Sequence, residues 1–237
     1  MAQPAHPVAE NFRQDSVGNQ GAQANFDPLA RVYFLLEYAA FGRELERARF
    51  CFLEKLRNCR DILLLGEGDG RCMARLAQIA PQARLHCVDA SQAMLHRAAA
   101  RLDAPTRSRV TFTCAEVQAW TPPVESCDAV VTLFFLDCFS PETVAALVAR
   151  MQPALRPGAL WLFADFILPA SGFARWRAQV WLRVMYCFFR WQTGLAVKML
   201  PPSEAILRAA GWKPQAIRDF HGVFVRSVLF SQPGCGS

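Results

Sequence analysis

The chain has 237 residues, of which 53% are hydrophobic, and it carries a formal net charge of +6. This length favours one domain, and the hydrophobic content argues against disorder over most of the chain. The basic residues are scattered, which indicates solvated surfaces and argues against a nucleic-acid-binding patch.

The cysteines favour a cytoplasmic protein. There are nine cysteines, which is an odd number. Most lie within apolar runs, and none forms a C-x-x-C pair. This pattern is typical of reduced thiols, and it argues against disulfides or a zinc site. The N-terminus shows no basic region followed by an apolar run, so no signal peptide is predicted.

The chain begins with a polar stretch and continues with a helical one. Residues 1–24 are polar and without periodicity, and we expect a flexible tail. The domain is expected over residues 25–232. Its first part, residues 25–58, has the apolar spacing of two helices broken at Gly42, which would form a helical cap.

Short apolar runs alternate with helical segments over residues 61–166, the expected cofactor-binding core. Strands are predicted at 62–65, 83–89, 109–115, 127–135 and 158–166. The helices between them have Ser91 and Ser140 as expected N-caps. This alternation predicts an α/β fold with a doubly wound, Rossmann-like sheet, whose ligands bind at the carboxyl ends of the strands.

The rest of the chain is predicted to complete this sheet on the substrate side. Residues 172–211 would form helices, with a long one at 172–191 that is rich in Trp, Phe and Arg. Residues 212–230 would form a closing strand pair with a turn at His221. Its first strand is expected to run parallel to the others and its last antiparallel, giving about seven strands.

The glycines of "LLLGEGDGR" follow a strand and open a helix, which is the context of a nucleotide-binding loop. Gly66, Gly68 and Gly70 alternate with Glu67 and Asp69. These acids would oppose a pyrophosphate and would suit a cofactor with positive charge beside an amino acid moiety. A tight turn without a ligand is the alternative interpretation.

Asp89 ends the next strand, within "CVDAS". An acid about 20 residues beyond the glycine loop is placed to accept both hydroxyls of a ribose. The alternative is a helix N-cap, although Ser91 can supply that without Asp89.

Several segments together resemble class I S-adenosylmethionine-dependent methyltransferases over about residues 26–230. They are "LLLGEGDGR", "CVDASQAML", "FTCAE", "DAVVTLFFLDCF" and "LRPGALWLFADF". "FDPLARVY" and "LPPSEAILRAAGW" make the ubiquinone/menaquinone C-methyltransferase type the nearest likeness. One departure is Leu64, where the family often has an acid that Glu67 could replace. The resemblance implies methyl transfer from S-adenosylmethionine to a small, hydrophobic or aromatic acceptor.

The resemblance also implies cofactor contacts at Gly66, Glu67, Gly68, Gly70, Asp89, Ala90, Met94, Ala115, Glu116, Leu133, Phe134, Tyr33 and Tyr38. The glycine loop would hold the methionine part and Asp89 the ribose. Met94 would pack on the adenine, and Ala115 with Glu116 would meet its edge. Leu133 and Phe134, near the end of the fourth predicted strand, would pass the amino acid end, and the two tyrosines would close over the cofactor.

Methyl transfer from a sulfonium depends mainly on alignment in a water-poor site, and a base is needed only when the acceptor must lose a proton. Asp165, Asp137 and His221 are candidate bases because each falls at the edge where parallel strands end. A loop cap, a helix cap and a turn residue are their ordinary structural alternatives. No metal site is expected.

The expected partner is a small, lipophilic acceptor. The segment 172–191 either caps the sheet or forms a lid over this acceptor, with peripheral contact at the inner membrane surface through its arginines. Two alternatives remain open: a catalytically inactive, cofactor-binding methyltransferase-like protein, and an NAD(P)-dependent oxidoreductase. The G-x-G-x-G spacing argues against the second. The sequence does not predict the oligomeric state.

Overall fold

The computed structural model describes residues 12–13, 43–168, 172, 200–220 and 224–232. The strands are β1 (Phe12–Arg13), β2 (Asp61–Leu65), β3 (Arg84–Asp89), β4 (Val110–Cys114), β5 (Cys127–Leu133), β6 (Leu155–Phe166), β7 (Lys213–Phe220) and β8 (Val225–Ser231). The α-helices are α2 (Glu44–Phe50), α3 (Arg71–Ile79), α4 (Gln92–Ala99), α5 (Ala104–Arg107), α6 (Pro141–Met151) and α8 (Ser203–Ala209). Short 3₁₀ helices are η1 (Leu53–Leu56), η2 (Leu136–Cys138) and η3 (Gln152–Ala154).

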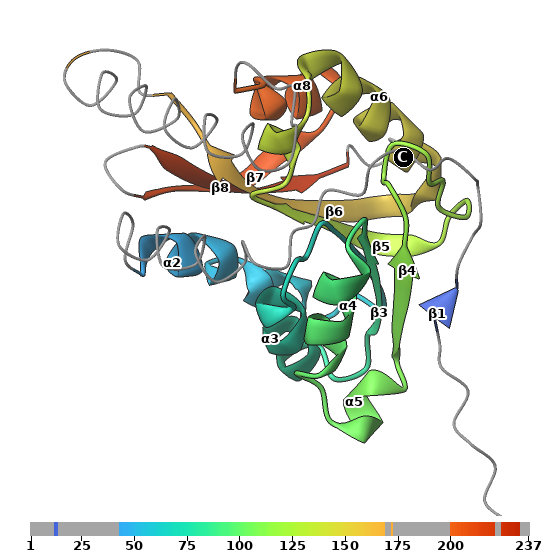
Figure 1. Ribbon diagram of the computed structural model, residues 1–237. Helices are drawn as coiled ribbons and strands as arrows, with labels where there is room; N and C mark the ends of the chain where they lie inside the picture. Colours follow the sequence, from blue (N-terminus) through green and yellow to red (C-terminus); the bar gives the residue numbers. More distant parts are fainter. Residues whose placement is uncertain (1–11, 14–42, 169–171, 173–199, 221–223, 233–237) are drawn as a thin grey trace, which may run out of the picture.

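The strands form a single mixed sheet in the order β1-β4-β3-β2-β5-β6-β8-β7, with helices on both faces (Figure 1). Neighbours from β1 to β6 pair in parallel, whereas β8 is antiparallel to both β6 and β7. Strand β7 therefore runs parallel to β6, as the sequence predicted. The order reverses between β2 and β5, and this switch point is where such sheets bind ligands.

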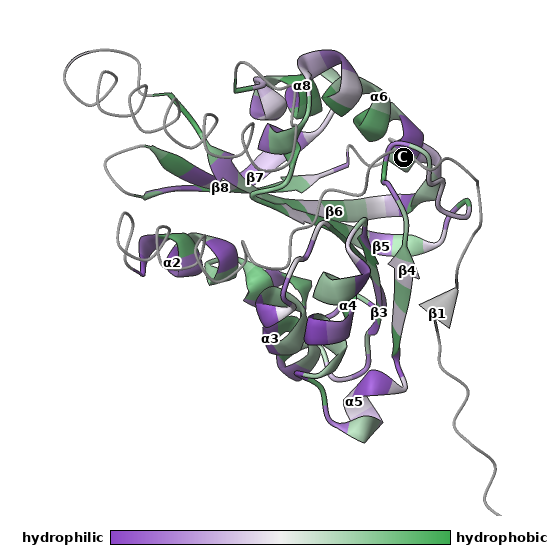
Figure 2. Ribbon diagram, viewed as in Figure 1, coloured by the Kyte–Doolittle hydropathy of each residue, from purple (hydrophilic) through white to green (hydrophobic). Residues whose placement is uncertain are grey.

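The core has two layers, because successive residues of a strand point to opposite faces of the sheet. Ile62 and Leu64 of β2 pack with α3 and α4, whereas Leu63 and Leu65 pack with α6. Figure 2 shows hydrophobic residues running through the central strands between these helical layers. Burying one such leucine contributes about 1.5–3 kcal/mol, so both layers hold β2 at the centre of the sheet.

The predicted helix starts are confirmed. The Ser91 hydroxyl accepts a hydrogen bond from the Met94 N–H at 3.3 Å, and the Ser140 hydroxyl accepts one from the Thr143 N–H at 3.3 Å. Pro141 occupies the first turn of α6, where its missing N–H costs nothing. These caps orient the helices that follow β3 and η2, and so they fix the loops at the carboxyl ends of the strands.

The structure differs from the expectation at three places. Phe12 and Arg13, within the predicted tail, pair with β4 and supply a strand beyond the expected seven. The strand predicted to reach residue 135 ends at Leu133, because Phe134 adopts a left-handed φ of 55°. The helix expected before the core is divided into α2 and η1.

The predicted helix 172–191 and the predicted turn at His221 lie outside the described residues, apart from Gly172. Within the described part of the chain, no helix is long and apolar enough to cross a membrane.

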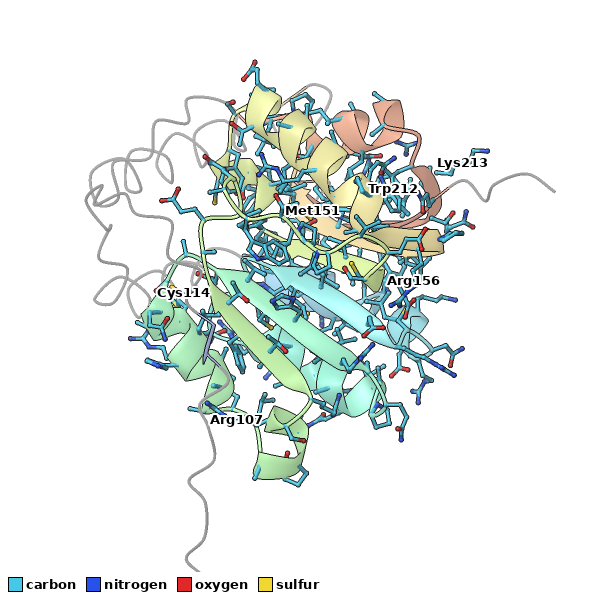
Figure 3. The ribbon with its side chains drawn as sticks, turned by 90° about the vertical axis from the view of Figure 1, so that its right-hand side faces the viewer. Arg107, Cys114, Met151, Arg156, Trp212 and Lys213 are labelled. Carbon is cyan, nitrogen blue, oxygen red and sulfur yellow. The ribbon has the colours of Figure 1, made fainter. Side chains whose placement is uncertain are left out.

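The two edges of the sheet differ in character. Near the start of β6, Arg156 forms ion pairs with Asp61 at 2.9 Å and with Asp128 at 2.7 Å, which closes the amino edge with charged partners. In Figure 3, Arg156 marks this edge and Cys114, at the end of β4, marks the carboxyl edge. The sequence-predicted site residues that the structure describes gather at the carboxyl edge.

Candidate functional site

The glycine loop links β2 to α3, and each of its glycines has a left-handed backbone. The φ angles are 65° at Gly66, 66° at Gly68 and 83° at Gly70. A Cβ at Gly66 would lie 1.9 Å from the Phe135 ring, and one at Gly70 would lie 2.5 Å from the Ala98 Cα. A Cβ at Gly68 would meet no described atom within 4 Å. Packing therefore requires the outer glycines, while the middle one adjoins space that a ligand can approach.

Asp89 connects this loop to the end of β3. Its Oδ2 accepts a hydrogen bond from the Gly68 N–H at 3.1 Å, and its Oδ1 accepts one from the Ser91 N–H at 2.9 Å. Burial raises the pKa of Asp89, and the two N–H donors oppose that rise. Each carboxylate oxygen keeps a further lone pair, so Asp89 can still accept from hydroxyl groups of a ligand.

The end of β4 joins the same edge. The Ala115 N–H donates to the Asp89 carbonyl at 3.1 Å, and the Cys114 thiol donates to the Ala90 carbonyl at 3.6 Å. Ala90 and Glu116 are exposed. Hydrogen bonds therefore connect the loops after β2, β3 and β4.

Both acids of the glycine loop have protein partners. Glu67 Oε1 accepts from the Met73 N–H at 2.8 Å and caps the first turn of α3, where Gly70 offers no side chain. Asp69 forms ion pairs with Arg101 at 2.7 Å and with Arg71 at 3.1 Å. The sequence interpretation had these acids facing a cationic ligand, whereas the described contacts direct them to the protein.

Burial raises the pKa of Glu67 to about 7, against the opposing effects of the Met73 N–H and the positive charge of Arg49. Glu67 therefore carries only part of a negative charge near neutral pH.

The remaining predicted cofactor residues are partly described. Met94 is half-buried in the first turn of α4, and Leu133 is buried at the end of β5. Phe134 is half-buried and its N–H donates to the Ala164 carbonyl at 2.7 Å, which ties the loop after β5 to β6. Tyr33 and Tyr38 lie outside the described residues.

Two of the predicted catalytic residues form a buried pair of carboxyl groups. The Asp137 N–H donates to Asp165 Oδ2 at 3.0 Å, and the Phe166 N–H donates to Asp165 Oδ1 at 2.9 Å. Burial raises the pKa of Asp137 to about 6 and raises the pKa of Asp165 well above its usual value, to which the Asp137 charge also contributes. The Cys138 thiol donates to Asp137 Oδ1 at 3.6 Å. The third candidate, His221, lies outside the described residues.

An aromatic cluster adjoins this pair at the carboxyl end of β6. Phe166 packs against Phe134 and Phe224 with ring centroids 5.3 Å and 5.2 Å apart. The guanidinium carbon of Arg49, from α2, lies 4.9 Å from the centroid of the Phe134 ring. Sequence reasoning did not identify Arg49, Phe166 or Phe224 as site residues, because only tertiary contacts bring them together. Within the described residues, no group of three or more His, Cys, Asp or Glu side chains could hold a metal ion.

The central part of the chain is similar in sequence to a known protein family. Residues 62–158, from β2 into β6, match the family model described as a methyltransferase domain. No curated protein sequence matches the chain.

The solved structures of similar fold include S-adenosylmethionine-dependent methyltransferase SibL, at 19% identity and a TM-score of 0.64, covering 87% of this chain and 58% of that one. The mitomycin 7-O-methyltransferase MmcR has 18% identity and a TM-score of 0.63, with coverage of 87% and 58%. This chain therefore spans little more than half the length of either protein.

A third structure matches over nearly its whole length. The 1,6-didemethyltoxoflavin-N1-methyltransferase of Burkholderia thailandensis, bound to its acceptor and S-adenosylhomocysteine, has 18% identity and a TM-score of 0.59, with coverage of 91% and 93%. These findings confirm the predicted methyltransferase fold and agree with its predicted cofactor, S-adenosylmethionine. They do not test the ubiquinone-type likeness.

Gly66→Ala is expected to lower the free energy of unfolding by about 2–4 kcal/mol, because a left-handed alanine and an overpacked Phe135 ring both cost energy. The matched control is Gly158→Ala, since Gly158 has a φ of 79° and a Cβ there would meet no described atom within 4 Å. The control should cost only about 1–2 kcal/mol. Urea denaturation measures both, and equal losses would contradict the steric role of Phe135.

Glu67 is expected to make stability fall as pH rises. Its pKa is near 4.5 when unfolded and about 7 when folded, so between these values the folded state binds more protons. Glu67→Gln keeps an acceptor for the Met73 N–H but cannot ionise. Between pH 4.5 and 7, the unfolding free energy of Glu67→Gln should therefore rise by about 1–3 kcal/mol relative to that of the wild type. Wild-type and Glu67→Gln stabilities that change in parallel with pH, measured by denaturant unfolding, would contradict this. The control is Glu54→Gln, which makes the same change at an exposed position.

Proposed function

We propose that this protein transfers the methyl group of S-adenosylmethionine to a small acceptor molecule. The observation that carries the proposal is the Asp89 carboxylate, which two backbone N–H groups hold beside the glycine loop at the edge where the strand order reverses. An acid at this position is suited to bind both hydroxyls of a ribose. The methyltransferase-domain match covers these same residues.

The backbone N–H groups of the glycine loop argue against a dinucleotide as the cofactor. A pyrophosphate needs free N–H groups at the start of the helix. Here the Gly66 N–H donates to the Val88 carbonyl, the Gly68 N–H donates to Asp89 and the Met73 N–H donates to Glu67. A cofactor without phosphate suits such a loop, which argues against the NAD(P)-dependent alternative.

The other described residues would contact the remaining parts of the cofactor. Met94 would pack on the adenine, whose edge would meet the backbone at Ala115 and Glu116. Leu133 and Phe134 would lie along the amino acid end. When bound, S-adenosylmethionine supplies an electrophilic methyl group on a sulfonium. The buried loop after β5 would exclude water and hold the acceptor in line with that methyl group.

Asp137 is the candidate general base, because it is the slightly less buried of the two residues, at 7% exposure against 2% for Asp165. Its raised pKa of about 6 is still low enough for the carboxylate to form near neutral pH. Asp165 would act as a positioning residue, since its Oδ2 accepts from the Asp137 N–H. Such a base serves only an acceptor that must lose a proton.

A lipophilic or aromatic acceptor would suit the half-buried ring of Phe134, which packs against the buried Phe166. A quinone-like molecule, which the sequence resemblance favours, has this chemistry. Two proteins of similar fold, the mitomycin 7-O-methyltransferase MmcR and the 1,6-didemethyltoxoflavin-N1-methyltransferase, are also named for small-molecule acceptors. Peripheral membrane contact through residues 172–191 stays a prediction from the sequence.

Calorimetry tests the cofactor. Wild-type protein is expected to bind S-adenosylhomocysteine and not NAD(H), and Asp89→Asn should weaken S-adenosylhomocysteine binding about 10–100-fold through loss of charged hydrogen bonds. Asp219→Asn removes an acid whose carboxylate pairs with Arg226, and it serves as the control. Binding of NAD(H) without S-adenosylhomocysteine would overturn the proposal.

Turnover with a panel of quinones, phenols and fatty acids tests the reaction. Asp137→Asn is expected to lower kcat about 10²–10⁴-fold while S-adenosylhomocysteine still binds. In the wild type, kcat/KM should fall below pH about 6, as Asp137 becomes protonated. Full activity of Asp137→Asn would exclude Asp137 as the base. Cofactor binding without turnover of any acceptor would favour the inactive methyltransferase-like alternative.

A further inference from the structure

The loop after β4 forms a closed turn over residues 116–120. The Glu116 carbonyl accepts hydrogen bonds from the Ala119 N–H at 2.9 Å and from the Trp120 N–H at 3.1 Å. Val117 and Trp120 are buried, whereas Glu116 is exposed. The buried side chains therefore anchor the turn and leave Glu116 exposed at the carboxyl edge of the sheet.

Arg150, near the end of α6, binds the next two carbonyl groups of this turn (Figure 1). Its Nη1 donates a hydrogen bond to the Val117 carbonyl at 3.2 Å and another to the Gln118 carbonyl. Buried side chains of α6 also share a core layer with Val117 and Trp120. A cationic side chain stabilises the carbonyl groups at the end of a helical turn. Arg150 therefore fixes the turn against α6.

The residue before the turn is tied to the loop that holds Asp89. The Ala115 N–H donates to the Asp89 carbonyl at 3.1 Å. Ala115 and Glu116, the residues proposed to meet the edge of the adenine, thus lie between two attachments. One attachment is to the end of β3, and the other is the guanidinium of Arg150.

Recognition of a purine at its edge needs accurate placement of the backbone that meets it. A hydrogen bond weakens steeply when its angle departs from linearity. Adenine differs from hypoxanthine at this edge, because hypoxanthine has an oxo group where adenine has an amino group. The loop can distinguish the two purines only while its backbone stays in place. A residue that holds the loop can therefore control this selectivity without touching the cofactor.

We infer that Arg150 is a positioning residue for adenine recognition, because it holds the turn that would present Ala115 and Glu116 to the purine edge. The inference rests on the proposed function, since it takes S-adenosylmethionine as the ligand. It extends the candidate cofactor site to the end of α6, a helix for which the sequence predicted no part in cofactor binding.

Two ligands that differ only at the purine edge test this role. S-adenosylhomocysteine carries adenine, and S-inosylhomocysteine carries hypoxanthine. By calorimetry, the wild type is expected to prefer S-adenosylhomocysteine by about 10–100-fold. Arg150→Gln is expected to weaken S-adenosylhomocysteine binding about 3–30-fold and S-inosylhomocysteine binding by less than about twofold, so the preference shrinks. Arg150→Lys should fall between the two, because lysine keeps the charge and loses the planar fork.

Arg109→Gln is the matched control. Arg109 also binds backbone carbonyl groups, those of Ala80 at 3.3 Å and Ala83 at 2.8 Å, but it precedes β4 and so lies at the amino end of that strand. Its replacement should lower the free energy of unfolding and leave the purine preference unchanged.

Equal weakening of both ligands by Arg150→Gln would overturn the inference and indicate a general structural role, and unchanged affinity for both would overturn it as well. An equal loss of preference in Arg109→Gln, or no preference in the wild type, would also overturn it. If Arg150→Gln does not fold, the same comparison is decided with Arg150→Lys. Failure of the wild type to bind S-adenosylhomocysteine would instead contradict the proposed function.

Discussion

The site depends on one carboxylate that two loops share. Asp89 accepts hydrogen bonds from the N–H groups of Gly68 and Ser91, and so it fixes the glycine loop against the start of α4. Gly68, whose N–H makes this contact, has a left-handed φ of 66°. Because the same carboxylate is the candidate ribose ligand, the contact that orders the loops also places the group that would recognise the ribose.

A second constraint is the burial of carboxyl groups at a single edge of the sheet. Glu67, Asp137 and Asp165 all lie at the carboxyl ends of strands, and burial raises the pKa of each. Their ionisation is costly, so the folded protein holds protons there that the unfolded chain would release. In contrast, the carboxylates of the amino edge lie in ion pairs with Arg156. Ion pairs thus stabilise negative charge at the amino edge, whereas burial opposes ionisation of these three carboxyl groups at the carboxyl edge.

Local patterns predicted the strands, the caps and the glycine loop. Short apolar runs indicated the strands, and hydrogen bonds between residues close in the chain determine the caps and the turn into α3. The hydroxyl of Ser91 and the turn at Gly70 are of this kind. Other features depend on contacts between residues far apart in the chain and left no local signal. The packing of Phe135 on Gly66 and the approach of Arg49 to Phe134 belong to this group. The Glu67 cap on the Met73 N–H is local, but the glycine-loop pattern indicated a ligand contact for this acid instead. The resemblance to methyltransferases supplied the cofactor roles, which no periodicity could provide.

The position of β8 has a consequence for how the chain acquires its fold. Strand β8 follows β7 in the chain but lies between β6 and β7 in the sheet. Until β8 has been synthesised, the long, buried strand β6 has an unpaired edge that could pair with another chain. The same delay applies to α2, which docks on β8 through the Ser227 hydroxyl. During synthesis, the N-terminal cap must therefore wait for one of the most distant elements of the chain, and an incomplete chain would be prone to aggregate.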